Sequence, residues 1–231
     1  MQEQDSDLRK GGLHMKEISG GVTAVQGFRA AGAVTGLKKN GNKDMALVFS
    51  DAEATVAGVF TTNVVKAAPV QRDIKIVKTR ETVRGVILNA GNANACTGEE
   101  GKKADAAMAQ AAAEALGVET DDILTCSTGV IGQLLPVEKV TKGAKILAAG
   151  LAADGGNEAA QAIMTTDTYS KQCAVEVEIG GKTVTIGAMT KGSGMIHPNM
   201  ATMLCVTTTD VCISKELLQE AISEVVKVSF N

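Results

Sequence analysis

A two-residue glycine turn between two alternating segments constrains this chain more than any other feature. Gly180 and Gly181 separate residues 173–179 from residues 183–188, and apolar and polar residues alternate in both flanking segments. A period of two places successive side chains on opposite faces of a strand, and paired glycines suit a tight hairpin turn. The pattern predicts an antiparallel hairpin and disfavours a purely parallel, doubly wound sheet.

Strand and helix signals alternate loosely along the rest of the chain. β-type runs predict strands at residues 45–49, 55–60, 83–88 and 203–206. Helices are expected at residues 102–116, 137–147 and 158–164 and after the cap residue Ser214. Thr97 and Glu100 have the spacing of a capping box before the first of these helices, which Gly117 ends. The mixture predicts an α/β fold with sheets covered by helices in layers.

The composition argues against two classes of binding partner, nucleic acids and membranes. The 231 residues, 45% of them apolar, suffice for one large domain or two small ones. A net charge of −3, with no Trp, one Tyr and four Phe, leaves neither a basic surface nor stacking rings for nucleic acid. No uncharged apolar run reaches the ~18 to 20 residues of a membrane-spanning helix, and the first residues lack the basic-then-apolar order that is typical of a signal peptide. We expect a cytoplasmic protein without nucleic-acid or membrane partners.

Cysteine and histidine are sparse. The five cysteines form no C-x-x-C pair, and His14 and His197 are the only histidines, so we expect reduced thiols and no metal site. Residues 1–15 are polar and without pattern, which predicts a disordered leader or tag.

The glycine-rich run at residues 191–201 leads to Thr202, which precedes an apolar stretch. A hydroxyl on a strained turn can attack the carbonyl before it, and cleavage between Ala201 and Thr202 would leave Thr202 with its own amine as a base. Gly192 would let the chain fold back, so Lys191 could meet Thr202 and hold an anionic substrate group. A solvated lysine at the end of a hairpin is the alternative.

Three further residues invite a functional interpretation. Thr128-Gly129 follows an apolar run, where turn N–H groups could form an oxyanion hole, although an ordinary turn has the same signature. Asp167 lies among three threonines and either orders hydroxyls or forms a turn. His197 has no evident acid partner, and nothing near Cys126 would lower its pKa, so neither is favoured for catalysis.

Four motifs together resemble the ornithine acetyltransferase family. They are Asn-Ala-Gly-Asn-Ala-Asn-Ala-Cys-Thr-Gly at 89–98, Ser-Thr-Gly-Val-Ile-Gly at 127–132, Ala-Ile-Met-Thr-Thr-Asp-Thr at 162–168, and Lys-Gly-Ser-Gly-Met-Ile through Asn-Met-Ala-Thr-Met-Leu at 191–204. The resemblance runs from Lys16 to Asn231 in the family's order. The family comprises bifunctional glutamate N-acetyltransferases and amino-acid acetyltransferases of arginine biosynthesis.

The resemblance implies a precursor that cleaves itself between Ala201 and Thr202 into α and β chains, with residues 16–201 as the α chain and 202–231 as the start of the β chain. Thr202 would take the acetyl group from N-acetylornithine and pass it to glutamate, and acetyl-CoA replaces the first donor in bifunctional members. Thr128 and Gly129 match the oxyanion pair, and Thr165, Lys191 and Thr202 match substrate contacts. A layered α/β/β/α sandwich with mixed or antiparallel sheets, an assembly of two α and two β chains, and no bound cofactor are also implied.

The family's β chain continues beyond the last residue here and supplies an acidic residue and C-terminal Asn and Thr contacts. A truncated chain is therefore expected, and an inactive fragment or a small-molecule binding module is one alternative function. A related N-terminal-nucleophile amidase or aminopeptidase, which would hydrolyse the acyl-enzyme, is the other.

Overall fold

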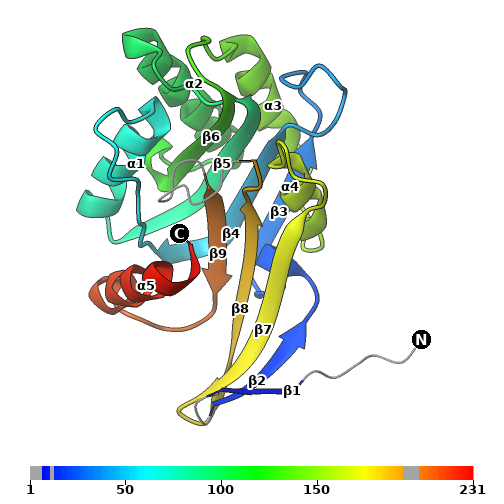
Figure 1. Ribbon diagram of the computed structural model, residues 1–231, viewed down its shortest axis with the longest axis vertical. Helices are drawn as coiled ribbons and strands as arrows, with labels where there is room; N and C mark the ends of the chain where they lie inside the picture. The colour runs from blue at the N-terminus through cyan, green and yellow to red at the C-terminus, as the bar shows by residue number, and fades with distance from the viewer. Residues whose placement is uncertain (1–6, 11–12, 195–202, 231) are drawn as a thin grey trace.

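The computed structural model describes residues 7–10, 13–194 and 203–230 (Figure 1). The strands are β1 Asp7–Lys10, β2 Leu13–Ile18, β3 Phe28–Ala33, β4 Met45–Thr55, β5 Thr82–Asn92, β6 Ile123–Val130, β7 Lys171–Ile179, β8 Lys182–Lys191 and β9 Leu204–Thr209. The helices are α1 Ala68–Thr79, α2 Gly98–Leu116, α3 Val137–Ala149, α4 Gly156–Ala162 and α5 Lys215–Ser229. None of the helices within these ranges is long and apolar enough to cross a membrane.

Two sheets form the centre of the molecule. The first has the order β3-β4-β5-β6 and is mixed, because only β5 and β6 run parallel. The second has the order β1-β2-β7-β8-β9 and is antiparallel throughout. The β7–β8 pair is the hairpin predicted around Gly180 and Gly181. The expected α/β class, with layered mixed and antiparallel sheets, is confirmed.

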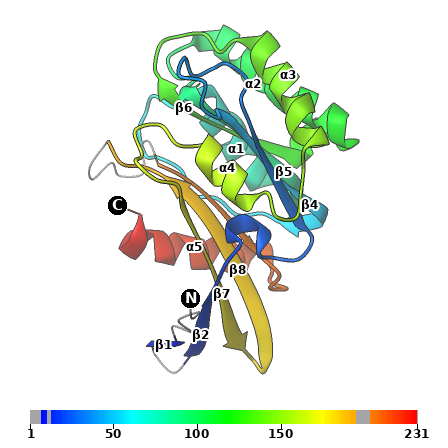
Figure 2. The ribbon, with the colours of Figure 1, turned by 90° about the vertical axis from the view of Figure 1, so that its right-hand side faces the viewer.

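The strand β4 shows why the sheets are layered. Its first six residues are buried although they alternate between two faces, which is typical of a strand covered on both sides. Met45, Leu47 and Phe49 pack in a cluster with α2 and α3, whereas Ala46 and Val48 pack in a second cluster with α4 and β8. The first sheet therefore lies between the α2–α3 layer and the second sheet, as Figure 2 shows from the side, and α5 lies beside the second sheet.

Several local predictions need correction. Residues 56–60 are not a strand, because the N–H and C=O of Gly58 bind the side chain of Gln219 instead of a neighbouring strand. The capping box at α2 is not formed, since the Thr97 hydroxyl donates to Asn94 Oδ1. The helix expected at residues 158–164 begins and ends two residues earlier. Within residues 1–15, where a disordered leader was expected, the structure has β1 and the start of β2.

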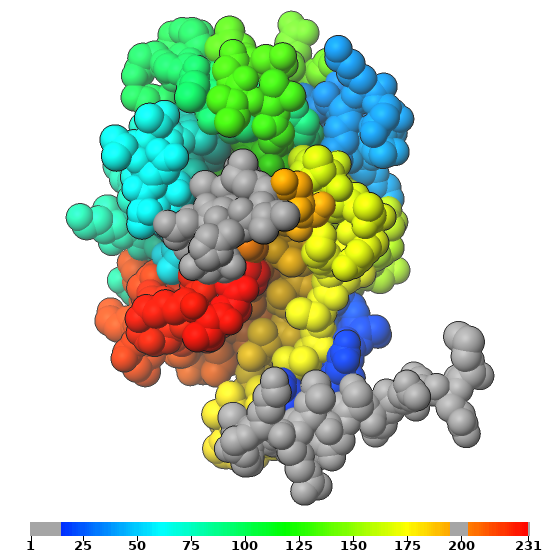
Figure 3. All heavy atoms as spheres, viewed as in Figure 1, coloured from blue at the N-terminus to red at the C-terminus, as the bar shows by residue number. Residues whose placement is uncertain are grey.

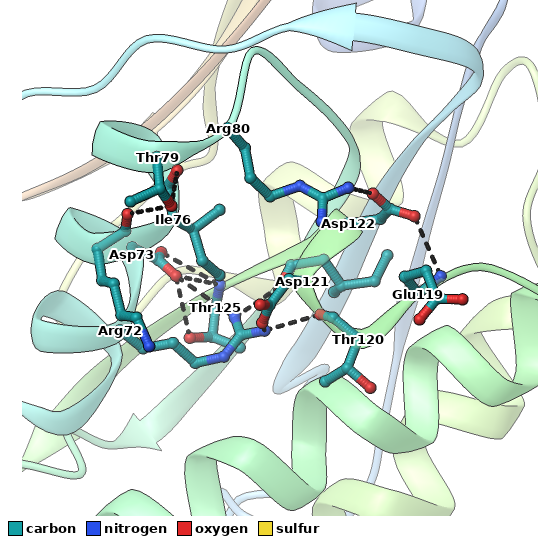
Figure 4. A network of polar contacts seen from close by, with 12 residues as sticks. Arg72, Asp73, Ile76, Thr79, Arg80, Glu119, Thr120, Asp121, Asp122 and Thr125 are labelled. Atoms are coloured by element: carbon teal, nitrogen blue, oxygen red, sulfur yellow. Dashed lines mark hydrogen bonds and ion pairs between the residues drawn. The ribbon is translucent and has the colours of Figure 1, made fainter.

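A buried polar network attaches α1 to β6 (Figure 4). Both carboxylate oxygens of Asp73 accept the N–H of Thr125, at 3.1 and 3.2 Å. Arg72 donates to the carbonyl of Ile123 at 2.6 Å and to that of Thr120 at 2.7 Å. These contacts hold the start of β6 in place, and the opposite end of the same strand carries Thr128 and Gly129.

Candidate active site

Three turns lie together at one end of the sheets: the end of β6, the loop of residues 164–168 between α4 and β7, and the turn after β8. The strands β5 and β6 are parallel, so their carboxyl ends meet at one edge, where Thr128 pairs with Ala90 and Gly129 with Gly91. The asparagine-rich motif and the Thr128-Gly129 motif, which are far apart in sequence, are therefore neighbours.

Gly129 occupies a position that accepts no side chain. Its φ angle is 136°, and a Cβ added there would lie 2.3 Å from the carbonyl carbon of Gly91. Glycine alone combines this backbone angle with so close an approach of two strands. Next to it, the Ser127 hydroxyl donates to Asn89 Oδ1 at 2.6 Å, and Asn89 Nδ2 donates to the carbonyl of Asn92 at 2.8 Å. The turn is thus held in a single register.

Lys191, the last residue of β8, is buried against the β6 turn. Its Nζ donates to the hydroxyl oxygen of Thr128 at 3.3 Å, and the two residues are 5% and 2% exposed. Burial lowers the pKa of Lys191, and Lys171 acts in the same direction, whereas the charge of Asp167 opposes both. The structure therefore excludes the alternative of a solvated lysine at the end of a hairpin.

Asp167 joins the other two turns. Its Oδ1 accepts the N–H of Gly192 at 3.0 Å and Lys171 Nζ at 2.5 Å, and its Oδ2 accepts the N–H of Thr165 at 3.0 Å. Burial alone would raise the pKa of Asp167, but Lys171 and the two amides outweigh it and lower the pKa to about 2. One carboxylate, ionised at neutral pH, thus fixes the Thr165 loop against the residue that follows Lys191.

The same two turns meet at the surface. The Ser193 hydroxyl donates to the carbonyl of Thr166 at 3.2 Å, and the N–H of Gly194 donates to the Thr166 hydroxyl at 3.2 Å. In Figure 3 the turn after Lys191 (orange) and the loop of residues 164–168 (yellow) lie side by side. The Thr165 side chain is exposed on this surface, where a ligand can reach it.

Comparison with known proteins shows the family of this chain and proteins of the same fold. The sequence profile of the ArgJ family matches residues 29–231, which is most of the chain. The chain belongs to the ArgJ family. Among its ArgJ relatives, the arginine biosynthesis bifunctional protein ArgJ of Symbiobacterium thermophilum is 53% identical over 219 residues, 94% of this chain and 54% of that protein. A chloroplastic protein of the same name from Oryza sativa subsp. indica is 50% identical and is covered over 47% of its length.

Two solved structures of ArgJ proteins have the same fold. The arginine biosynthesis bifunctional protein ArgJ of Bacillus halodurans superposes with a TM-score of 0.75 at 35% identity, covering 83% of this chain and 99% of that one. The ornithine acetyltransferase of Mycobacterium tuberculosis, solved with ornithine, gives a TM-score of 0.73 at 40% identity, covering 82% and 100%. The family resemblance read from the four motifs is confirmed. The chain spans about half the length of the curated ArgJ relatives it matches.

The structure brings together four of the residues predicted for an ArgJ site and leaves the others undescribed. Thr128, Gly129, Thr165 and Lys191 lie on the three adjoining turns. Ala201 and Thr202, the predicted cleavage pair, and His197 fall outside the described residues. On either side of that segment, Lys191 pairs with Leu204, and the Thr190 hydroxyl donates to the carbonyl of Leu204 at 2.9 Å.

Sequence reasoning missed two supporting features of this site. It did not decide whether Asp167 forms a turn or orders hydroxyl groups, and it did not predict the ion pair with Lys171, four residues later. It also gave no role to the Asn89–Ser127 hydrogen bond, because only the parallel pairing of β5 and β6 makes these residues neighbours. Burial raises the pKa of Cys126 well above its ordinary value, which argues against a thiolate nucleophile there.

Proposed function

We propose that this chain carries the acetyl-transfer site of an ornithine acetyltransferase, with Thr202 as nucleophile, Thr128 and Gly129 as the oxyanion hole, and Thr165 and Lys191 as substrate contacts. The acetyl group moves from N-acetylornithine to glutamate. The curated relatives are named as arginine biosynthesis proteins, and one structural neighbour is an ornithine acetyltransferase solved with ornithine. Both names support this assignment of substrates.

The buried contact between Lys191 and Thr128 carries the proposal. The Thr128 oxygen accepts a hydrogen bond from the lysine, which leaves the hydroxyl hydrogen free to donate to a second oxygen. Beside it, Gly129 is exposed and has no side chain of its own. A buried hydroxyl with a backbone donor fixed beside it suits a developing oxyanion, and removal of one such donor costs about 3 to 4 kcal/mol of transition-state stabilisation.

In the proposed cycle, the Thr202 oxygen attacks the acetyl carbonyl carbon of N-acetylornithine, and its proton passes to the α-amine of Thr202. The carbon–nitrogen bond breaks as that proton moves to the departing amine, so ornithine leaves and an acetyl ester remains on Thr202. The amine of glutamate then attacks the ester. N-acetylglutamate leaves, the hydroxyl of Thr202 is restored, and no oxidant or reductant is needed.

Chain lengths among the relatives support cleavage before Thr202. The curated relatives are about twice as long as the region they share with this chain. The two solved chains, in contrast, are matched over 99% and 100% of their lengths by 83% and 82% of this chain, so they are shorter than it. A precursor divided into two chains would account for both lengths.

The remaining expectations extend this proposal. The relatives are named bifunctional, which supports acetyl-CoA as a second acetyl donor, used without any resident cofactor. Cleavage into two chains would give an assembly of two α and two β chains. We also propose a cytoplasmic location for this protein, although the rice relative is named chloroplastic.

Intact-mass spectrometry tests the function directly. Two fragments that meet between Ala201 and Thr202, with one acetyl group added to the Thr202 fragment after N-acetylornithine treatment, are the expected result. Thr202→Ala should abolish both cleavage and acetylation, and cleavage that persists in this variant would show that the nucleophile is misassigned. Glutamate should discharge the acetyl-enzyme faster than water does. Equal discharge with and without glutamate would identify an amidase-like hydrolase instead.

A further inference from the structure

The loop of residues 34–44, between β3 and β4, is fixed by one buried carboxylate. Asp44 is completely buried, and its Oδ1 accepts the N–H and the hydroxyl of Thr35 at 2.7 and 2.8 Å. Its Oδ2 accepts the N–H groups of Leu37 and Lys38 at 2.6 and 3.0 Å. Four hydrogen bonds to one side chain give the backbone at Leu37 and Lys38 a defined position.

The Lys38 side chain reaches from this loop to the end of α4. Its Nζ donates to the carbonyl of Lys43 at 2.5 Å and to that of Ala162 at 3.1 Å. Ala162 is the last residue of α4, where helix carbonyls lack intrahelical partners and attract a positive charge. The chain continues from Ala162 directly into the loop that carries Thr165 and Asp167. Lys38 therefore fixes the point from which that loop starts.

The aliphatic stem of Lys38 lies against the end of β5, next to the Thr128-Gly129 turn. Gly91 has a φ of 111°, and a Cβ added to it would lie 3.4 Å from both the carbonyl oxygen of Leu37 and Cγ of Lys38. Gly91 in turn lies directly against Gly129, where an added Cβ would meet its carbonyl carbon. Loop 34–44, the end of β5 and the end of β6 thus lie against one another in this order, and neither Gly91 nor Gly129 has a side chain to separate them.

The Lys38 ammonium also contributes to the charge balance of the site. Burial lowers the pKa of Lys38, the carboxylates of Asp44 and Asp167 oppose that effect, and the charge of Lys191 adds to it. The charge of Lys191, at the end of β8, therefore acts on Lys38 in the loop between β3 and β4.

We propose that Lys38 is a positioning residue for acetyl transfer: it holds the Thr165 loop and the Thr128-Gly129 turn in a fixed relation through Ala162 on one side and Gly91 on the other. The kinetic part of this inference rests on the proposed function, whereas the structural part does not.

Lys38→Met, which keeps the stem and removes the ammonium, tests the inference, with Lys39→Met as the control because Lys39 is exposed on the same loop. In hydrogen exchange, we expect several-fold faster exchange of amides at residues 163–168, little change at 89–92 and 127–130, and no change in α2. Lys38→Ala, which also removes the stem, should extend the faster exchange to 89–92 and 127–130.

In acetyl transfer, Lys38→Met should lower kcat roughly 10- to 100-fold with little change in KM, since misplacement of about 1 Å costs rate more than binding. Lys38→Arg, which retains charge and donors, should restore part of kcat. Exchange and kcat equal to those of Lys39→Met would overturn the inference, and so would a uniform rise in exchange that includes α2. If Lys38→Met shows the local exchange changes but the wild-type protein transfers no acetyl group, the structural part of the inference is supported and the proposed function is rejected.

Discussion

The Nζ of Lys191 lies 3.3 Å from the Thr128 hydroxyl, although the two residues are 63 positions apart and belong to different sheets. The contact joins the end of an antiparallel hairpin to the end of a parallel strand pair. It places a positive charge beside a hydroxyl in a region from which water is largely excluded. Electrostatic interactions are stronger in such surroundings than at the surface.

Lys191→Met should therefore lower kcat/KM for N-acetylornithine about 100-fold without lowering the melting temperature. Methionine fills a similar volume, and the change removes the cost of a buried ammonium. Steady-state acetyl transfer and a thermal melt measure the two effects. Lys182→Met, at the exposed end of the same hairpin, is the control and should change neither quantity. A full loss of folding in Lys191→Met would show that the lysine is structural.

Gly129→Ala should destabilise the protein by about 2 to 4 kcal/mol, because the new Cβ would overlap the Gly91 carbonyl and the backbone angle disfavours alanine. Gly132→Ala provides a matched control: Gly132 also has a positive φ, of 79°, but nothing lies within 4 Å of an added Cβ. The control should lose only about 1 kcal/mol. Urea unfolding of both variants tests this prediction. Equal losses in the free energy of unfolding would show that the close approach to Gly91 does not affect stability.

Asp167→Asn should destabilise the protein by about 1 to 3 kcal/mol, since it removes the charge that pairs with Lys171. The lowered pKa of Asp167, about 2, also defines the pH range over which this residue stabilises the protein. Its stabilising contribution is present above the unfolded value of ~3.9 and is lost as the pH falls toward 2. Denaturation at several pH values should thus show a smaller difference between wild type and variant in acid. Asp51→Asn, which removes an exposed pair with Arg29, should cost at most about 0.5 kcal/mol.

Local signals in the sequence predicted local structure well. The Gly180-Gly181 hairpin is confirmed. The helices expected at 102–116 and 137–147 are found as α2, which begins four residues earlier, and α3, which ends two residues later. These elements depend on neighbouring residues: paired glycines, alanine content and a proline at the first turn. The helix α1 was missed, although Pro69 near its start is a similar signal.

Features that depend on distant residues could not be predicted. The run at residues 55–60 has the composition of a strand, but Gly58 binds Gln219, which is 161 positions away. Lys38 has no local pattern, and its role depends on Ala162, 124 positions later. For the site itself, spacing alone favoured an ordinary turn at Thr128-Gly129 and a solvated side chain at Lys191. Only the order of the four motifs indicated that these residues act together.

The acidic pair Asp73 and Asp105, beneath β6, should make stability depend on pH in the opposite sense to Asp167. Burial raises the pKa of Asp73 to about 8 and that of Asp105 to about 6, and each lies close to Thr125. Between ~4 and these values the unfolded chain has lost the protons that the folded protein retains. The free energy of unfolding should therefore fall as the pH rises from ~4 toward 8.

Asp105→Asn should remove the part of this slope between pH ~4 and 6, because asparagine does not ionise. Within the described part of the chain, Asp105 Oδ1 is buried and has no hydrogen-bond partner. The variant therefore places a neutral group where little stabilises an anion. We expect the variant to gain stability relative to wild type as the pH rises, by up to about 1.4 kcal/mol per pH unit within that window.

Urea unfolding across pH ~4 to 8 measures the slope, with the exposed Asp154→Asn as control. Parallel curves for wild type and Asp105→Asn would mean that Asp105 is ionised throughout this range, and that Arg72 compensates its charge more fully than the burial of the pair suggests.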